Sequence, residues 1–338
     1  MKFLSNWNFL LMIVLSVFLV ACGNDDSGTA GASGDGKTTI RVAIDTAAGG
    51  SFQIRAANAN GYFSENNLDV QLSNFAYGID TINAVLTEQT DTGLAADYAL
   101  LNSLNKGDFV VVSSLTGSDA QFNSVSLTEI LAVSDVKSPQ EIKGKKIGIA
   151  KGTVSEYHWI RYLEHYNISE EDIKYVPYST PDEAIVGMKK GDMDVVLASG
   201  ALIEKFKSIE GVHEIDRLSS VPDINVSSYL VVKREFAENN TEAIANFIEG
   251  INKGINYVKE NPDGTADIAY DDLKIAKEDV KHDLERINFT LGFTKEDYEH
   301  LSTMKQHLVE RGILEDYDLE SKLFLEPAKL VIPDKVTY

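Results

Sequence analysis

The chain has 338 residues, is 43% hydrophobic and 25% charged, and carries a formal net charge of −21 at neutral pH. This composition is that of a soluble globular protein, and the acidic charge excludes binding to nucleic acid phosphates. Its six histidines include no pair four residues apart, and a G-x-S-x-G turn is absent. We therefore expect no metal, no cofactor and no catalytic residue.

The first residues have the features of an export signal. Lys2 precedes a hydrophobic run over residues 9–20, which is too short for a comfortable membrane span. The run ends in Leu19-Val20-Ala21-Cys22, which contains the only cysteine and resembles a bacterial lipobox. We expect a signal peptide over residues 1–21 and lipidation at Cys22, which would anchor the protein on the extracytoplasmic face of a bacterial membrane. An N-terminal anchor helix with an incidental cysteine is the alternative.

Residues 22–38 are rich in Gly, Ser and Asp and contain no large apolar side chain, which is typical of a flexible linker. About 300 residues follow, enough for two lobes of ordinary size.

A strand–helix alternation begins at residue 39 and returns about a hundred residues later. In the first round the pattern predicts strands over 40–45, 68–72 and 92–95 and helices over 52–60 and 79–88. In the second it predicts strands over 146–150, 173–176 and 194–198 and helices over 154–166 and 181–190. The chain is therefore expected to be an α/β protein with two similar lobes, each built on a largely parallel sheet.

Two polar segments, residues 116–126 and 218–227, separate these rounds from the rest. Residues 109–115 predict a fourth strand of the first lobe, and the β-rich residues 229–232 would return to it. Two crossing segments would then form a hinge. We expect lobe 1 over 39–117 and 228–338, with helices through about residue 310 and a turn at Asn261-Pro262-Asp263-Gly264, and lobe 2 over 124–220.

Several segments resemble a known family. Residues 142–153, Ile-Lys-Gly-Lys-Lys-Ile-Gly-Ile-Ala-Lys-Gly-Thr, resemble the "LKGKKVAV-KGS" segment of solute-binding proteins that deliver sulfonates, taurine, nitrate or thiamine precursors to ABC importers. Further matches are Gly61-Tyr62-Phe63, Phe75-Ala76-Tyr77-Gly78, Asp91-Thr92-Gly93 and Tyr229-Leu230-Val231-Val232-Lys233. An aromatic-acidic pair common in sulfonate binders after the strand ending Leu197-Ala198-Ser199-Gly200 is absent here.

The resemblance implies a type II periplasmic-binding-protein fold, in which two Rossmann-like lobes close on a ligand in the cleft between them. It also implies the partners: a small-molecule ligand, an ABC permease and, through the lipid, a membrane, for a protein that acts as a monomer.

In such sheets ligands lie beyond the carboxyl ends of the strands, where helix N-termini offer N–H donors to an anion. The residues at these positions are small, hydroxylated or glycine, and each could equally be an ordinary turn or capping residue. The candidates are Thr46, Ser51, Tyr77, Gly78, Gly152, Thr153, Val154, Ser155, Ser199 and Gly200.

Three acidic residues favour a positively charged group on the ligand. Asp97, Asp119 and Glu156 would suit an ammonium or ring nitrogen, although they could also be a helix cap, a solvated hinge residue and a capping-box partner. Four aromatic side chains could hold a ring, or belong to the core or the cleft wall: Tyr77, Phe122, Tyr157 and Tyr229. A zwitterion such as an amino-sulfonate is favoured; the alternatives are a nitrogen heterocycle such as a thiamine precursor, or an exported enzyme on the same scaffold.

Overall fold

A computed structural model describes residues 36–46, 51–117, 125, 128–200 and 202–338. The proposed signal peptide and Cys22, and the candidates Asp119 and Phe122, lie outside the described residues. Within these ranges no helix has both the length and the apolar character needed to span a membrane.

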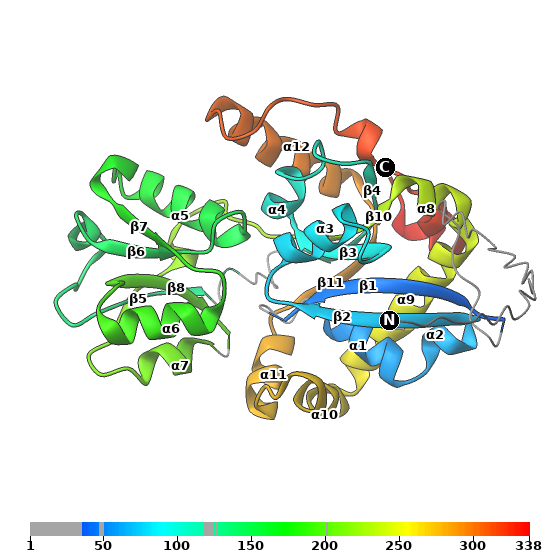
Figure 1. Cartoon of the computed structure of the whole chain (residues 1–338), viewed down its shortest axis with the longest axis horizontal. Coiled ribbons are helices and arrows are strands. Elements are labelled where there is room, and N and C mark those ends of the chain that lie inside the picture. Colours follow the sequence, from blue (N-terminus) through cyan, green and yellow to red (C-terminus); the bar gives the residue numbers. More distant parts are fainter. Residues whose placement is uncertain (1–35, 47–50, 118–124, 126–127, 201) are drawn as a thin grey trace, which may run out of the picture.

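Lobe 1 is built on a six-stranded sheet in the order β11-β4-β10-β3-β1-β2 (Figure 1). The strands are β1 (Thr38–Asp45), β2 (Leu68–Phe75), β3 (Thr92–Ala96), β4 (Phe109–Gly117), β10 (Ser228–Lys233) and β11 (Asn288–Gly292). β1 pairs in parallel with both β2 and β3, whereas β10 lies antiparallel between β3 and β4. The chain therefore returns from lobe 2 into the middle of the first sheet.

Helices cover both faces of this sheet. One face carries α3 (Gly78–Leu86), α4 (Asp97–Leu101) and α12 (Lys295–Glu310), and the other carries α1 (Phe52–Ala59), α9 (Thr241–Glu260) and α13 (Glu326–Val331). A Cβ on Gly254 of α9 would lie 2.1 Å from the Gln53 carbonyl oxygen of α1, so this glycine permits the close crossing of the two helices. The other helices of the lobe are α2 (Tyr62–Glu65), α8 (Arg234–Asn239), α10 (Pro262–Leu273) and α11 (Lys277–Leu284).

Lobe 2 contains a five-stranded sheet in the order β7-β6-β8-β5-β9. Its strands are β5 (Thr128–Ala132), β6 (Lys146–Ile149), β7 (Lys174–Pro177), β8 (Val195–Ser199) and β9 (His213–Arg217). The helix α5 (Val154–His165) covers one face, and α6 (Pro181–Lys190) and α7 (Leu202–Lys207) cover the other (Figure 1). Short 3-10 helices lie at Pro139–Ile142, Glu170–Asp172, Leu218–Ser220, Glu320–Lys322 and Pro333–Lys335.

The expected fold class is confirmed: two α/β lobes are connected by two crossings, from β4 to β5 and from β9 to β10. The expectation of a wholly helical C-terminal tail is wrong, because β11 interrupts it and forms an edge strand beside β4. The expected turn at Asn261 does end α9, but Pro262 begins α10 at once. Proline suits this first helical position because its missing N–H would have no partner there.

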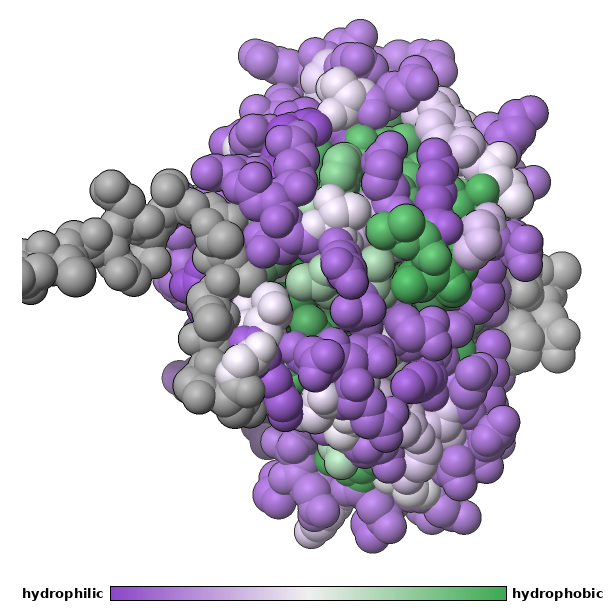
Figure 2. Space-filling view, turned by 90° about the vertical axis from the view of Figure 1, so that its right-hand side faces the viewer, coloured by the Kyte–Doolittle hydropathy of each residue, from purple (hydrophilic) through white to green (hydrophobic). Residues whose placement is uncertain are grey.

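The two lobes share one apolar cluster on the side where α4 meets α5. The Tyr98 and Tyr157 rings stack across the boundary with centroids 6.1 Å apart. By contrast, the end of lobe 1 farthest from lobe 2 is mainly hydrophilic, with hydrophobic residues exposed only in small areas (Figure 2).

Candidate functional site

The carboxyl ends of the parallel strands in the two lobes face each other. In lobe 1, β1 and β2 end in register at Asp45 and Phe75, so the loops that follow them share one edge of the sheet. In lobe 2, β6 leads to Gly152, where an added Cβ would lie 3.5 Å from the Ile79 side chain of α3. A Cβ added to Gly200, which follows β8, would lie 2.9 Å from a carboxylate oxygen of Asp283 in α11. Residues after two strand ends of lobe 2 therefore lie against α3 and α11 of lobe 1. We refer to this boundary between the lobes as the gap.

Gly78 brings the N-terminus of α3 against the sheet. A Cβ there would lie 2.9 Å from the Ala95 Cα, which leaves no space for a side chain. Tyr77 precedes the helix, and its backbone N–H donates to the Asp80 carboxylate at 3.2 Å. Burial raises the pKa of the Tyr77 phenol, and the neighbouring Tyr178 of lobe 2 adds to this effect. The Tyr77 ring thus belongs to the boundary between the lobes.

The lobe 2 loop is held mainly by its own side chains. Gly152 has a φ of +77°, which favours glycine, and its N–H donates to the Glu156 carboxylate at 2.8 Å. The Thr153 hydroxyl donates to the Ala150 carbonyl at 2.7 Å and accepts from the Ser155 N–H at 3.1 Å. The Ser155 hydroxyl is buried and lies beside the Tyr178 phenol of the same lobe. Val154 begins α5 directly after this loop.

Asp97 is fully buried, and its carboxylate contacts three protein donors. It accepts hydrogen bonds from the Tyr98 N–H at 2.8 Å, the Ser227 N–H at 2.9 Å and the His300 ring at 2.7 Å. The first residue of α4 is thereby connected to the second crossing segment and to α12. In this arrangement the carboxylate holds α4, the second crossing segment and α12 together, and it does not face an open cavity.

Two histidines lie near this carboxylate and differ in their pKa shifts. Burial opposes protonation of His300, but the hydrogen bond and charge of Asp97 outweigh it, so the pKa is raised. His158 of α5 is buried, and the loss of solvation lowers its pKa to about 4 although Asp97 opposes this shift. Its Nε2 has no hydrogen-bond partner among the described residues. The hinge region therefore contains a buried neutral imidazole from lobe 2 beside a carboxylate from lobe 1.

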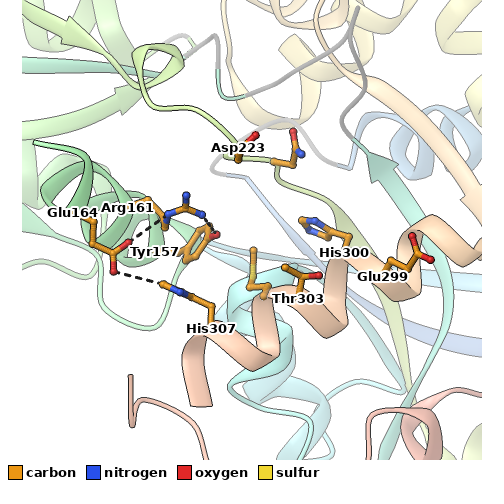
Figure 3. Close-up of a pocket in the computed structure, with 10 residues that line it drawn as sticks. Tyr157, Arg161, Glu164, Asp223, Glu299, His300, Thr303 and His307 are labelled. Carbon is orange, nitrogen blue, oxygen red and sulfur yellow. Dashed lines mark hydrogen bonds and ion pairs between the residues drawn. The ribbon is translucent and has the colours of Figure 1, made fainter. Parts of the chain in front are cut away.

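A pocket of about 520 Å³ lies between α5, the second crossing segment and α12 (Figure 3). The Arg161 guanidinium donates to the Tyr157 hydroxyl at 3.0 Å and lies 3.5 Å from Glu164. His307 also approaches Glu164, at 3.7 Å. The residues that line the pocket are Tyr157, Arg161, Glu164, Asp223, Asn225, Glu299, His300, Thr303, Met304 and His307.

Arg311, the residue that follows α12, also connects this helix to lobe 2, because it forms ion pairs with both Glu164 and Glu170. This pocket thus has walls from both lobes, and its shape depends on how they are placed.

The remaining sequence candidates occupy varied surroundings. The Thr46 hydroxyl donates to the Phe75 carbonyl at 3.2 Å, and the buried Ser51 hydroxyl donates to the Asp45 carbonyl at 3.0 Å. The Ser199 hydroxyl is 2.6 Å from that of Thr128. Tyr229 is buried in β10 and packs beside Phe293.

Sequence reasoning missed a buried cation beside the β1 and β2 ends. The Arg55 side chain donates to the Ser51 hydroxyl at 3.1 Å and to Asn74 at 2.7 Å, and it pairs with Asp272 at 3.2 Å. Burial lowers its pKa, and the Asp272 charge opposes this. The sequence feature that could have indicated this buried arginine is its position within the run FQIRAANA of α1, which contains several apolar residues.

Sequence reasoning also missed Tyr98, Tyr178, Asp283 and His300, because their roles arise from contacts between distant segments. Throughout the described ranges, His, Cys, Asp and Glu side chains do not gather in any group of three suited to a metal ion.

Comparisons with known proteins agree with this architecture. A putative aliphatic sulfonates-binding protein of Bacillus subtilis (strain 168) is 24% identical over 276 residues, which cover 78% of each chain. A yeast relative, the 4-amino-5-hydroxymethyl-2-methylpyrimidine phosphate synthase THI13 of Saccharomyces cerevisiae, is 24% identical over 61% of this chain and 62% of its own length.

Among solved structures, the alkanesulfonate-binding protein SsuA from Xanthomonas axonopodis pv. citri, bound to MOPS, superimposes with a TM-score of 0.73 and 14% identity. The match covers 85% of this chain and 98% of that protein, and it shows the shared fold. The model of the family described as NMT1/THI5 like matches residues 51–265, which run from the start of α1 through lobe 2 and beyond the end of α9. The chain therefore belongs to the NMT1/THI5-like family.

Proposed function

We propose that this protein is a lipid-anchored solute receptor of an ABC importer, located on the extracytoplasmic face of a bacterial cell membrane. The observation that carries the proposal is the approach of lobe 2 strand-end residues to lobe 1 helices, Gly152 to Ile79 of α3 and Gly200 to Asp283 of α11. A solute bound in that gap would touch both lobes and favour their closure. The closed form would dock on the permease, and the receptor acts as a monomer.

The favoured solute is a small sulfonate, in particular a zwitterion with an amino group. The helices α3 and α5 begin at Gly78 and Val154, so the positive ends of two helices from different lobes adjoin the gap. The Ser155 hydroxyl, in the first turn of α5, would supply a further donor. A relative and a structural neighbour named for sulfonates support the same ligand class.

A ligand panel tests the receptor function. The processed protein, purified in detergent, is titrated with taurine, ethanesulfonate, nitrate, a hydroxymethyl-aminopyrimidine and a polyamine. Binding to the native form raises the melting temperature, and sulfonates should produce the largest increase. Trp159, fully buried in α5, reports closure by fluorescence, because the other tryptophan, Trp7, lies in the proposed signal peptide. If neither method responds to any compound, the receptor proposal fails.

Two other functions are distinguished by the same panel. The name of the yeast relative favours a pyrimidine ligand, and this alternative predicts that only the pyrimidine raises the melting temperature. That relative is also named as an enzyme, so an exported enzyme on this scaffold remains the alternative of another class. It predicts chemical conversion of a bound compound, measured by mass spectrometry after incubation with the protein.

The anchor and the lobe limits are proposals with their own tests. Replacing Cys22 by Ser should abolish lipidation and keep the N-terminal residues attached, as read by mass spectrometry of the N-terminal peptide. We place lobe 1 at 39–117 and 228–338 and lobe 2 at 124–220, with residues 22–38 as the linker. Limited proteolysis should then cut first within residues 22–38.

A further inference from the structure

A carboxylate of lobe 1 approaches the backbone of lobe 2 at one boundary of the gap. Asp283 lies in α11, which faces lobe 2 in Figure 1. A Cβ added to Gly200 would lie 2.9 and 3.0 Å from the two Asp283 oxygens. Gly200 also has a φ of +55°, which side chains rarely adopt. The absence of a side chain at Gly200 therefore leaves room for the carboxylate directly beside the end of β8.

This carboxylate is only partly satisfied by the protein. Its Oδ1 is buried and has no hydrogen-bond partner among the described residues. Burial raises the pKa of Asp283 to about 6, the Asp279 charge adds to this shift, and Arg286 opposes it. A buried oxygen without a donor is costly, and native proteins almost always provide one from protein, water or ligand.

We propose that Asp283 is a specificity-determining residue that accepts a hydrogen bond from a protonated amino group of the solute. This inference rests on the proposed receptor function and narrows its ligand class to zwitterions with an ammonium group. The anionic end of the solute would lie toward the helix N-termini at Gly78 and Val154, and the ammonium group would lie toward α11. Asp97 cannot serve this purpose in the observed arrangement, because its carboxylate already binds three protein donors.

Paired ligands test the role of Asp283. Taurine and ethanesulfonate differ only in the amino group, and both are titrated calorimetrically at pH 7.5 into the processed protein. Wild type should bind taurine roughly ten- to a hundredfold more tightly, as expected for one hydrogen bond between charged groups. Asp283→Asn should remove this preference by weakening taurine binding while ethanesulfonate binding changes little. Glu278→Gln, an exposed charge removal on the same helix, is the matched control and should keep the preference.

A pH series on wild type gives a second measurement that needs no variant. As pH falls below about 6 the Asp283 carboxylate becomes protonated, so taurine affinity should fall relative to ethanesulfonate affinity. The neighbouring charged groups Asp279 and Arg286 are present with either ligand, so their own effects on the two affinities should be equal. Protonation of the hinge histidines His158 and His300 should change both affinities by the same factor, so it cancels in their ratio.

The outcomes separate this inference from the receptor function. If wild type binds both compounds equally, or if Asp283→Asn weakens both to the same extent, Asp283 does not recognise an amino group, although sulfonate binding stands. If a compound without an amino group raises the melting temperature and taurine does not, the inference is likewise overturned. If the whole panel fails to bind, the receptor function and this inference fall together.

Discussion

The Asp97 carboxylate of α4 lies 2.7 Å from the His300 ring nitrogen of α12, although 203 positions separate the two residues in the chain. The same oxygen accepts the Ser227 N–H of the second crossing segment. One buried oxygen thus joins the first lobe, the hinge and the C-terminal helix that contacts lobe 2. Because lobe closure moves the hinge, this connection should affect stability and solute affinity together.

Replacing Asp97 by Asn tests this connection. The amide retains one acceptor oxygen but cannot accept from all three donors, so we expect the free energy of unfolding to fall by about 1 to 3 kcal/mol. Because Asp97 acts through the hinge, taurine and ethanesulfonate affinities should decrease by the same factor. Chemical denaturation and calorimetry measure the two effects. A loss restricted to taurine would instead place Asp97 in direct contact with an amino group.

The buried His158 predicts a loss of stability in acid. Its pKa is about 4 in the folded protein against an ordinary value of 6.5, so unfolding takes up a proton between these values. The free energy of unfolding should therefore fall as pH decreases from 6.5 to 4, by about 3 kcal/mol in total. Above pH 6.5 the group is neutral in both states and contributes no pH dependence.

The variant His158→Gln isolates this contribution, because His300, whose raised pKa acts in the opposite direction, is present in both proteins. Urea denaturation is measured for each from pH 4 to 7. The difference in the free energy of unfolding between wild type and His158→Gln should become smaller, or change sign, as the pH falls from 7 to 4. Parallel pH curves for the two proteins would mean that His158 is not the group that titrates.

The strand–helix order was predictable because local periodicity and helix caps determine it. The helix predicted over 181–190 is observed as Pro181–Lys190, with the Thr180 hydroxyl accepting from the Glu183 N–H at its start. β11 escaped prediction because Asn288–Gly292 is short, lies in a charged region and gains strand structure only by pairing with β4. The approximate position of the strand-end loops was likewise predictable, since parallel strands place their carboxyl ends at one edge.

The partners of the site residues were not predictable from spacing. Asp283 approaches Gly200 across the two lobes, and His300 reaches Asp97 from the C-terminal helix. Neither pair has a local pattern, because each contact depends on how helices after β10 pack against the rest of the molecule. The sequence indicated which loops adjoin the gap but not which side chains the protein itself already satisfies.

Arg311→Gln tests whether α12 holds the lobes together. Arg311 pairs with Glu164 and Glu170 of lobe 2, and all three side chains are partly exposed. Such pairs contribute about 0.2 to 1 kcal/mol each, so the loss of both should weaken solute affinity by roughly two- to thirtyfold. The effect should diminish at high salt because counterions screen exposed charges.

The matched control is Arg217→Gln, since Arg217 also pairs with two acidic residues, Glu129 and Glu214, but within lobe 2. Its loss should leave solute affinity unchanged in calorimetric titrations. Equal weakening by both variants would show that the Arg311 pairs have no special role between the lobes.

Gly78→Ala tests whether the start of α3 must lie against the sheet. The new Cβ would lie 2.9 Å from the Ala95 Cα and 3.2 Å from its Cβ, and neither atom belongs to a flexible side chain. The N-terminus of α3 must then move outward, so we expect a loss of about 1 to 3 kcal/mol in stability. Solute affinity should also fall, and by more than the loss of folded protein would cause, because the N-terminus of α3 would move away from the gap.

Gly187→Ala in α6 is the appropriate comparison. Its Cβ would meet only the flexible Met193 side chain, at 3.0 Å, and the position lies away from the strand-end loops. It should therefore cost less stability and leave the calorimetric affinity for taurine and ethanesulfonate intact. If Gly78→Ala binds both compounds as tightly as wild type, the N-terminus of α3 does not contribute to binding the solute, and the anionic group must be held elsewhere.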